Sequence, residues 1–374
     1  MLRILQVFSK LGRGGAETMI MNYYRNIDRS QIQFDFLVQY PDKEAYEDEI
    51  ESLGGKIYRI DPIRKVGPYK YKKELYNFFQ KHPYQIIHSH RDEMSGLVLK
   101  EAYRANIPIR IAHSHTSAVK YQNLEKWLKK IYKNEIHQYA TKKLSCSEAA
   151  GQWMFQGDPF TVINNAINIE KFEFDPMIRK KIRENFQIVD EQFVIGHVRS
   201  LSYPKNHEFL IEVFNEICKI KKNSVLLIVG GGPLQNKVKE KISKMGLTEN
   251  VIFTGVRSDI SDLMQSMDVF VFPSRYEGFP VTLVEAQASG LPCIVSDVIT
   301  KEAQIVDLVQ NLSLDNSLSI WTDTIIRAGK DQDKNLVQRQ AERKKYLKLL
   351  KEKNFDIKTE AKTLENYYLG CLKA

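Results

Sequence analysis

Two glutamates eight residues apart mark the carboxyl-terminal half of the sequence. A short apolar run, Val269–Phe272, precedes a segment that places Glu277 before Pro280 and Glu285 after it. Because Pro is favoured at the first position of a helix, we expect Glu277 in a loop and Glu285 within the helix that follows. A helix start between two carboxylates suits a ligand that carries both hydroxyl groups and a phosphate.

The start of this predicted helix is the expected phosphate site. Its residues are Phe279, Pro280, Val281 and Thr282, and exposed N–H groups in this segment can bind an anion. The alternative is that both glutamates are solvated on a surface helix. The residues that flank Glu285 are mostly apolar, which indicates a largely buried helix instead.

Two cations follow another predicted strand in the same half. Arg199 ends the run that begins at Phe193, and Lys205 comes six residues later. An Arg can bind a diphosphate as a two-pronged fork and a Lys as a point charge, so the pair can converge on one anion. The nearby turn Gly230–Pro233 predicts little beyond a strand-to-helix connection.

A glycine-rich loop lies near the amino terminus. The sequence Gly12–Glu17 follows a predicted strand and precedes a predicted helix, so a phosphate or sugar could bind against its backbone. The dinucleotide fingerprint G-x-G-x-x-G is not met, because Ala16, Glu17 and Thr18 stand where its last glycine is due. A loop required only for turn geometry remains the alternative.

Two H-x-H pairs end predicted strands: His88 with His90, and His113 with His115. Residues i and i+2 of a strand point the same way, so each pair could bind a metal. A metal-dependent hydrolase is therefore one alternative function. Metal-dependent hydrolases usually add acidic ligands close to such pairs, and few acidic residues lie near these. The other interpretation is that each histidine is a polar side chain at a strand end, hydrogen-bonded within the protein. We expect no metal.

Short β-branched runs alternate with amphipathic segments of helical length, which is typical of an α/β protein with parallel sheets. The predicted strands are 3–8, 34–39, 57–60, 85–88, 109–113, 143–147, 160–163, 193–198, 225–229, 251–254, 269–272 and 293–296. They form two doubly wound domains, expected at 1–188 and 189–374, and the final helix is expected to return to the first. Ligands of such sheets bind beyond the carboxyl ends of the strands, so we expect a central cleft between the domains.

Composition and charge limit the class of protein. The chain has a net charge of +9, of which 30 − 23 = +7 falls in residues 1–190 and 25 − 23 = +2 in the remainder. No apolar run is long enough to cross a bilayer, and the four separated cysteines fit a reducing cytoplasm. The basic excess has no nucleic-acid-binding motif beside it, so we expect no nucleic acid partner.

These features resemble the family 4 (group 1) retaining glycosyltransferases of the GT-B fold, in particular bacterial enzymes of capsule and exopolysaccharide synthesis. The resemblance spans nearly the whole chain. It rests on Gly12–Glu17, His115-Thr116, Arg199 with Lys205, Phe253–Arg257 and, most specifically, the Glu277-x7-Glu285 motif. It implies two Rossmann-like domains and transfer of a hexose from a nucleoside-diphosphate sugar, expected to be a UDP-sugar, with retention of configuration and without a metal.

The resemblance also implies roles for individual residues. Arg199 and Lys205 would hold the donor diphosphate and stabilise the leaving group. Glu285 would hydrogen-bond the ribose hydroxyls, and Glu277 would face the donor sugar. A catalytically silent sugar-nucleotide-binding subunit is a second alternative, but it would be expected to lack the two cations.

The remaining roles implied by the resemblance concern both halves of the chain. His115 would lie by the reacting face of the sugar, Gly14 and Gly15 beneath the phosphates, and the backbone near Val256 and Arg257 against the nucleobase. The chain departs from the family at 298–302, where a glycine-rich acidic turn is common, so the rim of the donor pocket is less well predicted. The D-x-D at 331–333 is interpreted as surface.

The acceptor is expected to be a glycan or a lipid-diphosphate-linked sugar, met by the basic amino-terminal domain. Residues 56–82 contain eight basic and two acidic residues, and residues 119–143 contain seven and two, with aromatic and apolar residues interleaved. Such segments predict peripheral contact with the anionic inner face of the cell membrane. The alternative is that the apolar residues pack on the domain's own sheet.

Overall fold

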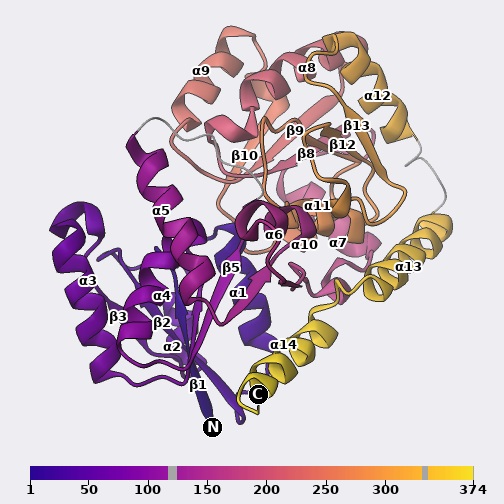
Figure 1. The fold of residues 1–374 in the computed structure, drawn as a ribbon. Coiled ribbons are helices and arrows are strands. Elements are labelled where there is room, and N and C mark those ends of the chain that lie inside the picture. Colours follow the sequence, from indigo (N-terminus) through magenta and orange to yellow (C-terminus); the bar gives the residue numbers. More distant parts are fainter. Residues whose placement is uncertain (117–123, 331–335, 374) are drawn as a thin grey trace. The chain divides into compact units, whose positions relative to one another are not determined.

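The chain divides into two compact units (Figure 1). The computed structural model describes residues 1–116, 124–330 and 336–373, and for 124–128, 330 and 336–340 it describes the backbone alone. Unit 1 comprises Met1–Ile167 and Asp356–Ala374, and unit 2 comprises Asn168–Phe355. The carboxyl-terminal segment therefore returns to the unit in which the chain begins.

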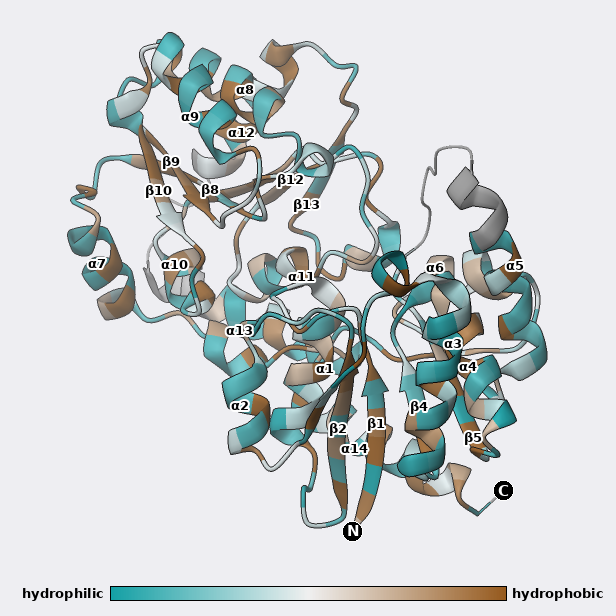
Figure 2. Cartoon of the chain, turned by 90° about the vertical axis from the view of Figure 1, so that its left-hand side faces the viewer, coloured by the Kyte–Doolittle hydropathy of each residue, from teal (hydrophilic) through white to brown (hydrophobic). Residues whose placement is uncertain are grey.

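Unit 1 contains a seven-stranded parallel sheet of order β3-β2-β1-β4-β5-β6-β7. Its strands are β1 (Leu2–Val7), β2 (Ile32–Val38), β3 (Ile57–Arg59), β4 (Ile86–Ser89), β5 (Ile109–Ser114), β6 (Lys142–Ser145) and β7 (Thr161–Val162). Every residue of β2 is buried, as expected for a strand covered on both faces. Figure 2 shows β1 and β2 largely hydrophobic along their length.

Helices cover both faces of this sheet. They are α1 (Gly15–Asn26), α2 (Glu47–Ser52), α3 (Ile63–Lys81), α4 (Ser95–Arg104), α5 (Leu124–Tyr139), α6 (Glu148–Phe155) and α14 (Ile357–Cys371). Alternate strand residues point to opposite faces, so Ile4 packs with α1 and α14, whereas Leu5 packs with α3 and α4. Helix α3 is kinked at Gly67, where φ is +78°.

Unit 2 contains a six-stranded parallel sheet of order β10-β9-β8-β11-β12-β13. Its strands are β8 (Phe193–Val198), β9 (Ser224–Val229), β10 (Val251–Gly255), β11 (Val269–Phe272), β12 (Cys293–Ser296) and β13 (Val309–Leu312). Its helices are α7 (Pro176–Asn185), α8 (His207–Ile220), α9 (Gln235–Lys244), α10 (Ile260–Gln265), α11 (Val281–Ala288), α12 (Leu318–Lys330) and α13 (Leu336–Glu352). The two doubly wound α/β domains are confirmed.

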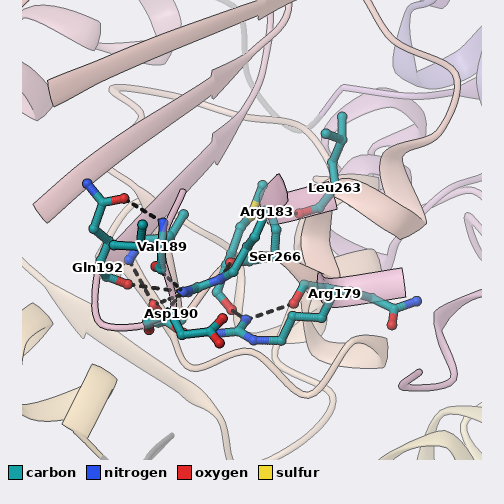
Figure 3. A network of polar contacts seen from close by, with 11 residues as sticks. Arg179, Arg183, Val189, Asp190, Gln192, Leu263 and Ser266 are labelled. Carbon is teal, nitrogen blue, oxygen red and sulfur yellow. Dashed lines mark hydrogen bonds and ion pairs between the residues drawn. The ribbon is translucent and has the colours of Figure 1, made fainter. Parts of the chain in front are cut away.

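The division between the units lies after Ile167 rather than after residue 188, where we expected it. Two arginines of α7 explain the difference, because both bind Asp268 of unit 2: Arg179 at 2.6 Å and Arg183 at 2.8 Å. Arg183 is 2 % exposed and also donates to the carbonyl oxygens of Ser266, Val189, Asp190 and Gln192 (Figure 3). The segment that contains α7 is therefore part of unit 2.

Each sheet has one point at which the strand order reverses. In unit 1 this point lies between β1 and β4, and in unit 2 between β8 and β11. Loops that leave the carboxyl ends of two such strands diverge to opposite faces of the sheet and leave room for a ligand. Most of the residues predicted to do chemistry follow these four strands or their neighbours, whereas Val256 and Arg257 follow β10 at the edge of the second sheet.

Candidate active site

The cations predicted in unit 2 share one carboxylate. Arg199 directly follows β8, Lys205 ends a short 3-10 helix (Tyr203–Lys205), and Glu277 lies in the loop after β11. Lys205 Nζ donates to both oxygens of Glu277 at 2.7 and 2.8 Å, and Arg199 Nη2 donates to one of them at 2.9 Å. The structure therefore brings these three residues together at the point where the strand order of the sheet reverses.

This cluster is shielded from solvent. The side chains of Arg199, Lys205 and Glu277 are 15 %, 16 % and 6 % exposed. Burial, followed by repulsion from Arg199, lowers the pKa of Lys205. Ser274 Oγ also donates to Glu277 at 2.8 Å, and the Arg199 guanidinium lies 4.8 Å from the centre of the Phe272 ring. Two shielded cations with one shared carboxylate make a positively charged site for an anionic ligand.

The glycine turn after β9 supports the loop that carries Arg199. The Arg199 N–H donates to Val229 O at 2.9 Å, and the Leu201 N–H donates to Gly231 O at 3.0 Å. At Gly230, whose φ is +138°, an added Cβ would lie 2.1 Å from the carbonyl oxygen of Arg199. The sequence predicted only a turn here, because the close approach of the two loops is a tertiary contact.

Helix α11 begins at Val281, so Pro280 lies at the helix start as predicted, but at the N-cap rather than at the first helical position. The ring of Phe279 stacks on Phe355 with centroids 5.8 Å apart, which anchors the loop before the helix. Thr282 Oγ1 is buried, and the described residues offer it no hydrogen-bond partner. The first turn of α11 thus presents a buried hydroxyl next to the amide groups of a helix start.

Glu285 lies within α11, as expected. Burial raises the pKa of its carboxyl to about 7, and the positive charge of Arg199 acts in the opposite direction. The carboxyl is therefore desolvated and lies within electrostatic reach of the cation pair. It can serve as a hydrogen-bonding partner for ligand hydroxyl groups.

The residues expected near a nucleobase lie after β10, two strands away from β8 across the sheet. Val256 is 63 % exposed, and an added Cβ at Gly231 would lie 3.2 Å from its Cγ2. Arg257 forms an ion pair with Asp259 at 2.6 Å. Val256 therefore borders the glycine turn that supports Arg199, whereas Arg257 is engaged with its own loop.

In unit 1 the glycine-rich loop leads directly into α1. Helix α1 begins at Gly15, and Gly14 is its N-cap. An added Cβ at Gly14 would lie 2.2 Å from the carboxylate of Glu17, whereas one at Gly15 would meet nothing within 4 Å. Burial raises the pKa of Glu17 to about 7.

His115 follows β5 and is held by the loop after β4. Its backbone N–H donates to Asp92 Oδ1 at 2.9 Å, and Thr116 Oγ1 donates to Asp92 Oδ2 at 3.2 Å. Burial lowers the pKa of His115 to about 3, so its ring is neutral at ordinary pH. A neutral imidazole can donate one hydrogen bond and accept another, but it cannot serve as a cation.

The two H-x-H pairs come together at the carboxyl ends of β4 and β5. Ligand atoms of His88, His90 and His113 lie within 4.8 Å of one another, so these residues are close enough for a metal group. However, His88 Nε2 is hydrogen-bonded to His113 Nδ1 at 3.0 Å, and His90 Nδ1 to His115 Nε2 at 2.8 Å. Most of the lone pairs that a metal would need are thus already engaged within the protein.

Two predictions fall wholly or partly outside the described residues. The D-x-D at 331–333 lies entirely outside them, and of the basic segment 119–143 residues 119–123 are not described and 124–128 are described as backbone alone. Within the described part of the chain, no helix has both the length and the apolar character needed to span a bilayer.

The chain matches two family models that together cover most of its length. Residues 13–171 match Glycosyltransferase Family 4, and residues 178–345 match Glycosyl transferases group 1. The putative glycosyltransferase EpsF of Bacillus subtilis (strain 168) is 36% identical over 335 residues, which is 87% of each chain.

A second relative and a solved structure agree. The UDP-Gal:alpha-D-GlcNAc-diphosphoundecaprenol alpha-1,3-galactosyltransferase of Escherichia coli is 28% identical over 284 residues, 72% of this chain and 73% of that one. The crystal structure of Anabaena Alr3699/HepE in complex with UDP-glucose has a TM-score of 0.80 at 19% identity, covering 99% of this chain and 100% of that chain. At this low identity the comparison with Alr3699/HepE shows the fold alone. None of these comparisons supports the alternative function of a metal-dependent hydrolase. The chain belongs to the family 4 (group 1) glycosyltransferases of the GT-B fold and is a glycosyltransferase.

Proposed function

We propose that this glycosyltransferase moves a hexose from a UDP-sugar to a lipid-diphosphate-linked sugar or another glycan in the synthesis of a surface polysaccharide. The E. coli relative takes UDP-Gal and a sugar on diphosphoundecaprenol, as its name states, and Alr3699/HepE binds UDP-glucose. These two proteins support the choice of a uridine nucleotide and of a lipid-linked acceptor.

The observation that carries the proposal is the shared carboxylate of Arg199 and Lys205. One carboxylate leaves a net positive charge on the cluster, and a diphosphate supplies the missing negative charge. During transfer, the bond between the anomeric carbon and the diphosphate oxygen breaks, and negative charge develops on that oxygen. Fixed cations in a shielded site stabilise this charge more in the transition state than in the ground state.

The other predicted residues complete the donor site in this proposal. Glu285 hydrogen-bonds the ribose hydroxyl groups, and the segment from Phe279 to Thr282 provides amide groups for the phosphate. The backbone at Val256 and Arg257 contacts the uracil. These roles agree with the position of all these residues in unit 2 beyond the carboxyl ends of its strands.

We assign two further roles in unit 1 and one in unit 2. His115 contacts the transferred sugar as a neutral hydrogen-bonding group, and the loop at Gly14 and Gly15 approaches the phosphates with its backbone. Glu277 keeps the two cations in place and faces the sugar through its loop. Transfer proceeds with retention of configuration, and no residue of the protein forms a covalent intermediate. No metal is needed, because the two cations stabilise the charge that develops on the leaving diphosphate.

A screen of UDP-, GDP- and ADP-sugars by thermal unfolding tests the donor. A ligand at a hundredfold excess over its Kd stabilises the folded state by about 2.7 kcal/mol, which is a readily measured shift in Tm. We expect UDP-sugars alone to produce the shift. At the same concentration of ligand, Lys205→Ala should show a smaller shift, whereas Lys222→Ala, which changes an exposed lysine of the same unit, should keep the full shift.

The stereochemistry of the product tests the mechanism. With the UDP-hexose found in the screen and a synthetic lipid-diphosphate-linked sugar, proton NMR of the product should show the same anomeric configuration as the donor. An inverted product would overturn retention. Stabilisation by GDP- or ADP-sugars instead of UDP-sugars would overturn the choice of nucleotide.

We further propose that unit 1 contacts anionic membrane through its basic residues, because a lipid-linked acceptor lies at a membrane surface. The aromatic residues of 56–82 do not form the exposed face that the sequence predicted. Tyr71 and Phe79 are fully buried, and Tyr58, Tyr76 and Phe78 pack against the core of the unit, which leaves Tyr69 exposed. The contact therefore depends on charge, with each Lys or Arg near the surface contributing about 1 kcal/mol.

Co-sedimentation with liposomes of varied anionic content tests this contact. Binding should occur at low salt, fall at high salt and weaken in the triple variant Arg64→Gln, Lys70→Gln, Lys73→Gln. A matched variant of unit 2, Lys219→Gln, Lys222→Gln, Lys244→Gln, should bind as the unchanged protein does. Equal binding by both variants would overturn the assignment of these residues.

A further inference from the structure

A chain of hydrogen bonds connects the carboxyl-terminal helix to His113. The hydroxyl of Tyr368, in α14, lies 2.6 Å from His88 Nδ1, and His88 Nε2 lies 3.0 Å from His113 Nδ1. His113 Nε2, at the end of this chain, is buried and has no hydrogen-bond partner among the described residues. All three side chains are at most 1 % exposed.

A second chain begins at Gln6 of β1 and ends at His115. Gln6 Oε1 lies 2.8 Å from His90 Nε2, and His90 Nδ1 lies 2.8 Å from His115 Nε2. His115 Nδ1 is likewise buried and without a partner among the described residues. The two chains therefore end on the two histidines of the pair after β5, whose rings stack with centroids 4.2 Å apart.

Gln6 joins the two chains. Its Nε2 donates to the hydroxyl of Tyr368 at 3.3 Å, while its Oε1 faces His90. An amide has a donor end and an acceptor end, and a neutral imidazole has one nitrogen of each kind. The direction of every hydrogen bond in both chains therefore follows from the orientation of this one amide.

The directions can be followed ring by ring. Gln6 donates to the Tyr368 hydroxyl, and among the described residues His88 Nδ1 is the acceptor for the proton of that hydroxyl; His88 then donates from Nε2 to His113. His113 is left with an Nε2–H. In the second chain Gln6 Oε1 accepts from His90 Nε2, His90 Nδ1 accepts from His115 Nε2, and His115 is left with a bare Nδ1.

We infer that Gln6 and Tyr368 are positioning residues for the transfer reaction: they fix the tautomers of the four histidines, so that His115 presents an acceptor at Nδ1 and His113 a donor at Nε2. This inference rests on the proposed contact between His115 and the transferred sugar. A donor and an acceptor on stacked rings are the complement of a sugar hydroxyl, which both donates and accepts.

The surroundings of the histidines support a fixed arrangement of neutral rings. Phe8 stacks on His90 with centroids 4.3 Å apart and planes 9° apart, and the His88 and His90 rings lie 4.1 Å apart. Burial lowers the pKa of all four histidines, so none carries a charge at ordinary pH. In the opposite amide orientation all four tautomers would reverse together, which would make His115 a donor and His113 an acceptor.

The variant Tyr368→Phe tests this inference, because it keeps the buried ring and removes only the hydroxyl. Gln6 then loses the hydrogen bond that couples its amide to His88, so the two chains no longer hold each other in one direction, and His115 should populate both tautomers. The control is Tyr367→Phe, the same change at the preceding, partly buried position of α14, whose hydroxyl has no hydrogen-bond partner among the described residues. It should leave the tautomers and the kcat unchanged.

Two readouts are needed. In two-bond proton–nitrogen correlation spectra of protein with labelled histidine, assigned by comparison with His115→Gln, the His115 ring of the unchanged protein should be protonated at Nε2 alone. In Tyr368→Phe both tautomers should appear. We expect the kcat to fall about tenfold while the KM for the donor changes less than about twofold, since a wrong tautomer impairs the reaction rather than folding.

Three outcomes would overturn the inference: an Nδ1–H on His115 of the unchanged protein, a single unaltered tautomer in Tyr368→Phe, or a mixed tautomer with an unchanged kcat. The spectra need no substrate. The tautomer result is therefore decided separately from the identity of the donor, and failure of the UDP-sugar proposal would not be mistaken for failure of this one.

Discussion

Lys205 Nζ lies 2.7 and 2.8 Å from the two carboxylate oxygens of Glu277, so one carboxylate holds the lysine with both of its oxygens while it also accepts from Arg199. All three side chains are largely shielded from water. The single negative charge balances only one of the two cations, and the cluster depends on that charge for its geometry.

Removing this charge should destabilise the free protein. We expect Glu277→Gln to lower the free energy of unfolding by about 3 kcal/mol, because it leaves two shielded cations without an anion. Glu216→Gln, which breaks an exposed ion pair with Lys219, should cost less than about 0.5 kcal/mol. Denaturant unfolding measures both, and saturating UDP should stabilise Glu277→Gln more than the unchanged protein. Equal stability of the two variants would contradict the shielding of the cluster.

The carboxyl of Glu285 should make stability depend on pH. Burial raises its pKa from 4.5 to about 7 in the folded protein, so the folded state binds the proton more tightly than the unfolded state. The contribution of this carboxyl to the free energy of unfolding is fully present below about pH 4.5 and is lost as the pH rises through about 7.

The variant Glu285→Gln removes the titration and keeps the shape. It should be as stable as the unchanged protein near pH 4.5 and more stable at pH 8, by up to about 3 kcal/mol. Its glycosyl transfer should fall at least a hundredfold, because it alters the proposed ribose contact. A stability difference that is the same at both pH values would show that the carboxyl is not desolvated.

The turn at Gly230 should tolerate no side chain. An added Cβ would lie 2.1 Å from the carbonyl oxygen of Arg199, so Gly230→Ala must displace the loop that carries this cation. We expect the kcat to fall at least about tenfold. Gly246→Ala is the matched control, because Gly246 also has a positive φ but an added Cβ there meets nothing within 4 Å. It should lose about 1 kcal/mol of stability and no activity.

Much of the fold could be predicted from sequence because its strands are apolar and bounded by glycine, proline or polar residues. Strand β13 (Val309–Leu312) was missed, since Gln310 and Asn311 are exposed and interrupt the apolar pattern. The unit boundary was placed too late because α7 is tied to unit 2 by Asp268, a partner 89 residues from Arg179 and 85 from Arg183.

In the candidate site, too, the features set by local sequence could be predicted, whereas those set by contacts between distant residues could not. The spacing of Glu277 and Glu285 is a local signal, and the structure places the first in a loop and the second in a helix as predicted. The bond between Tyr368 and His88 joins residues 280 positions apart, and no local pattern reveals it. The sequence therefore identified the candidate ligand-binding residues better than the residues that position them.

Excess EDTA should leave transfer unchanged. The proposed mechanism uses Arg199 and Lys205 in place of a divalent cation. The hydrogen bonds that His88, His90 and His113 make with one another and with their neighbours engage most of the lone pairs that a metal would need. Initial rates measured after dialysis against EDTA, with and without added Mg²⁺ or Mn²⁺, should agree within about twofold. Activity that returns only on addition of a metal would contradict metal-independent transfer.

The binding of the donor diphosphate by Lys205 and Arg199 is the central claim, and calorimetric titration of UDP against uridine tests it most directly. The unchanged protein should bind UDP at least about a hundredfold more tightly than uridine, a difference of about 2.7 kcal/mol. In Lys205→Ala the affinity for UDP should fall at least tenfold while that for uridine stays the same, and Lys222→Ala should match the unchanged protein. Equal affinity of the unchanged protein and Lys205→Ala for UDP would contradict the account.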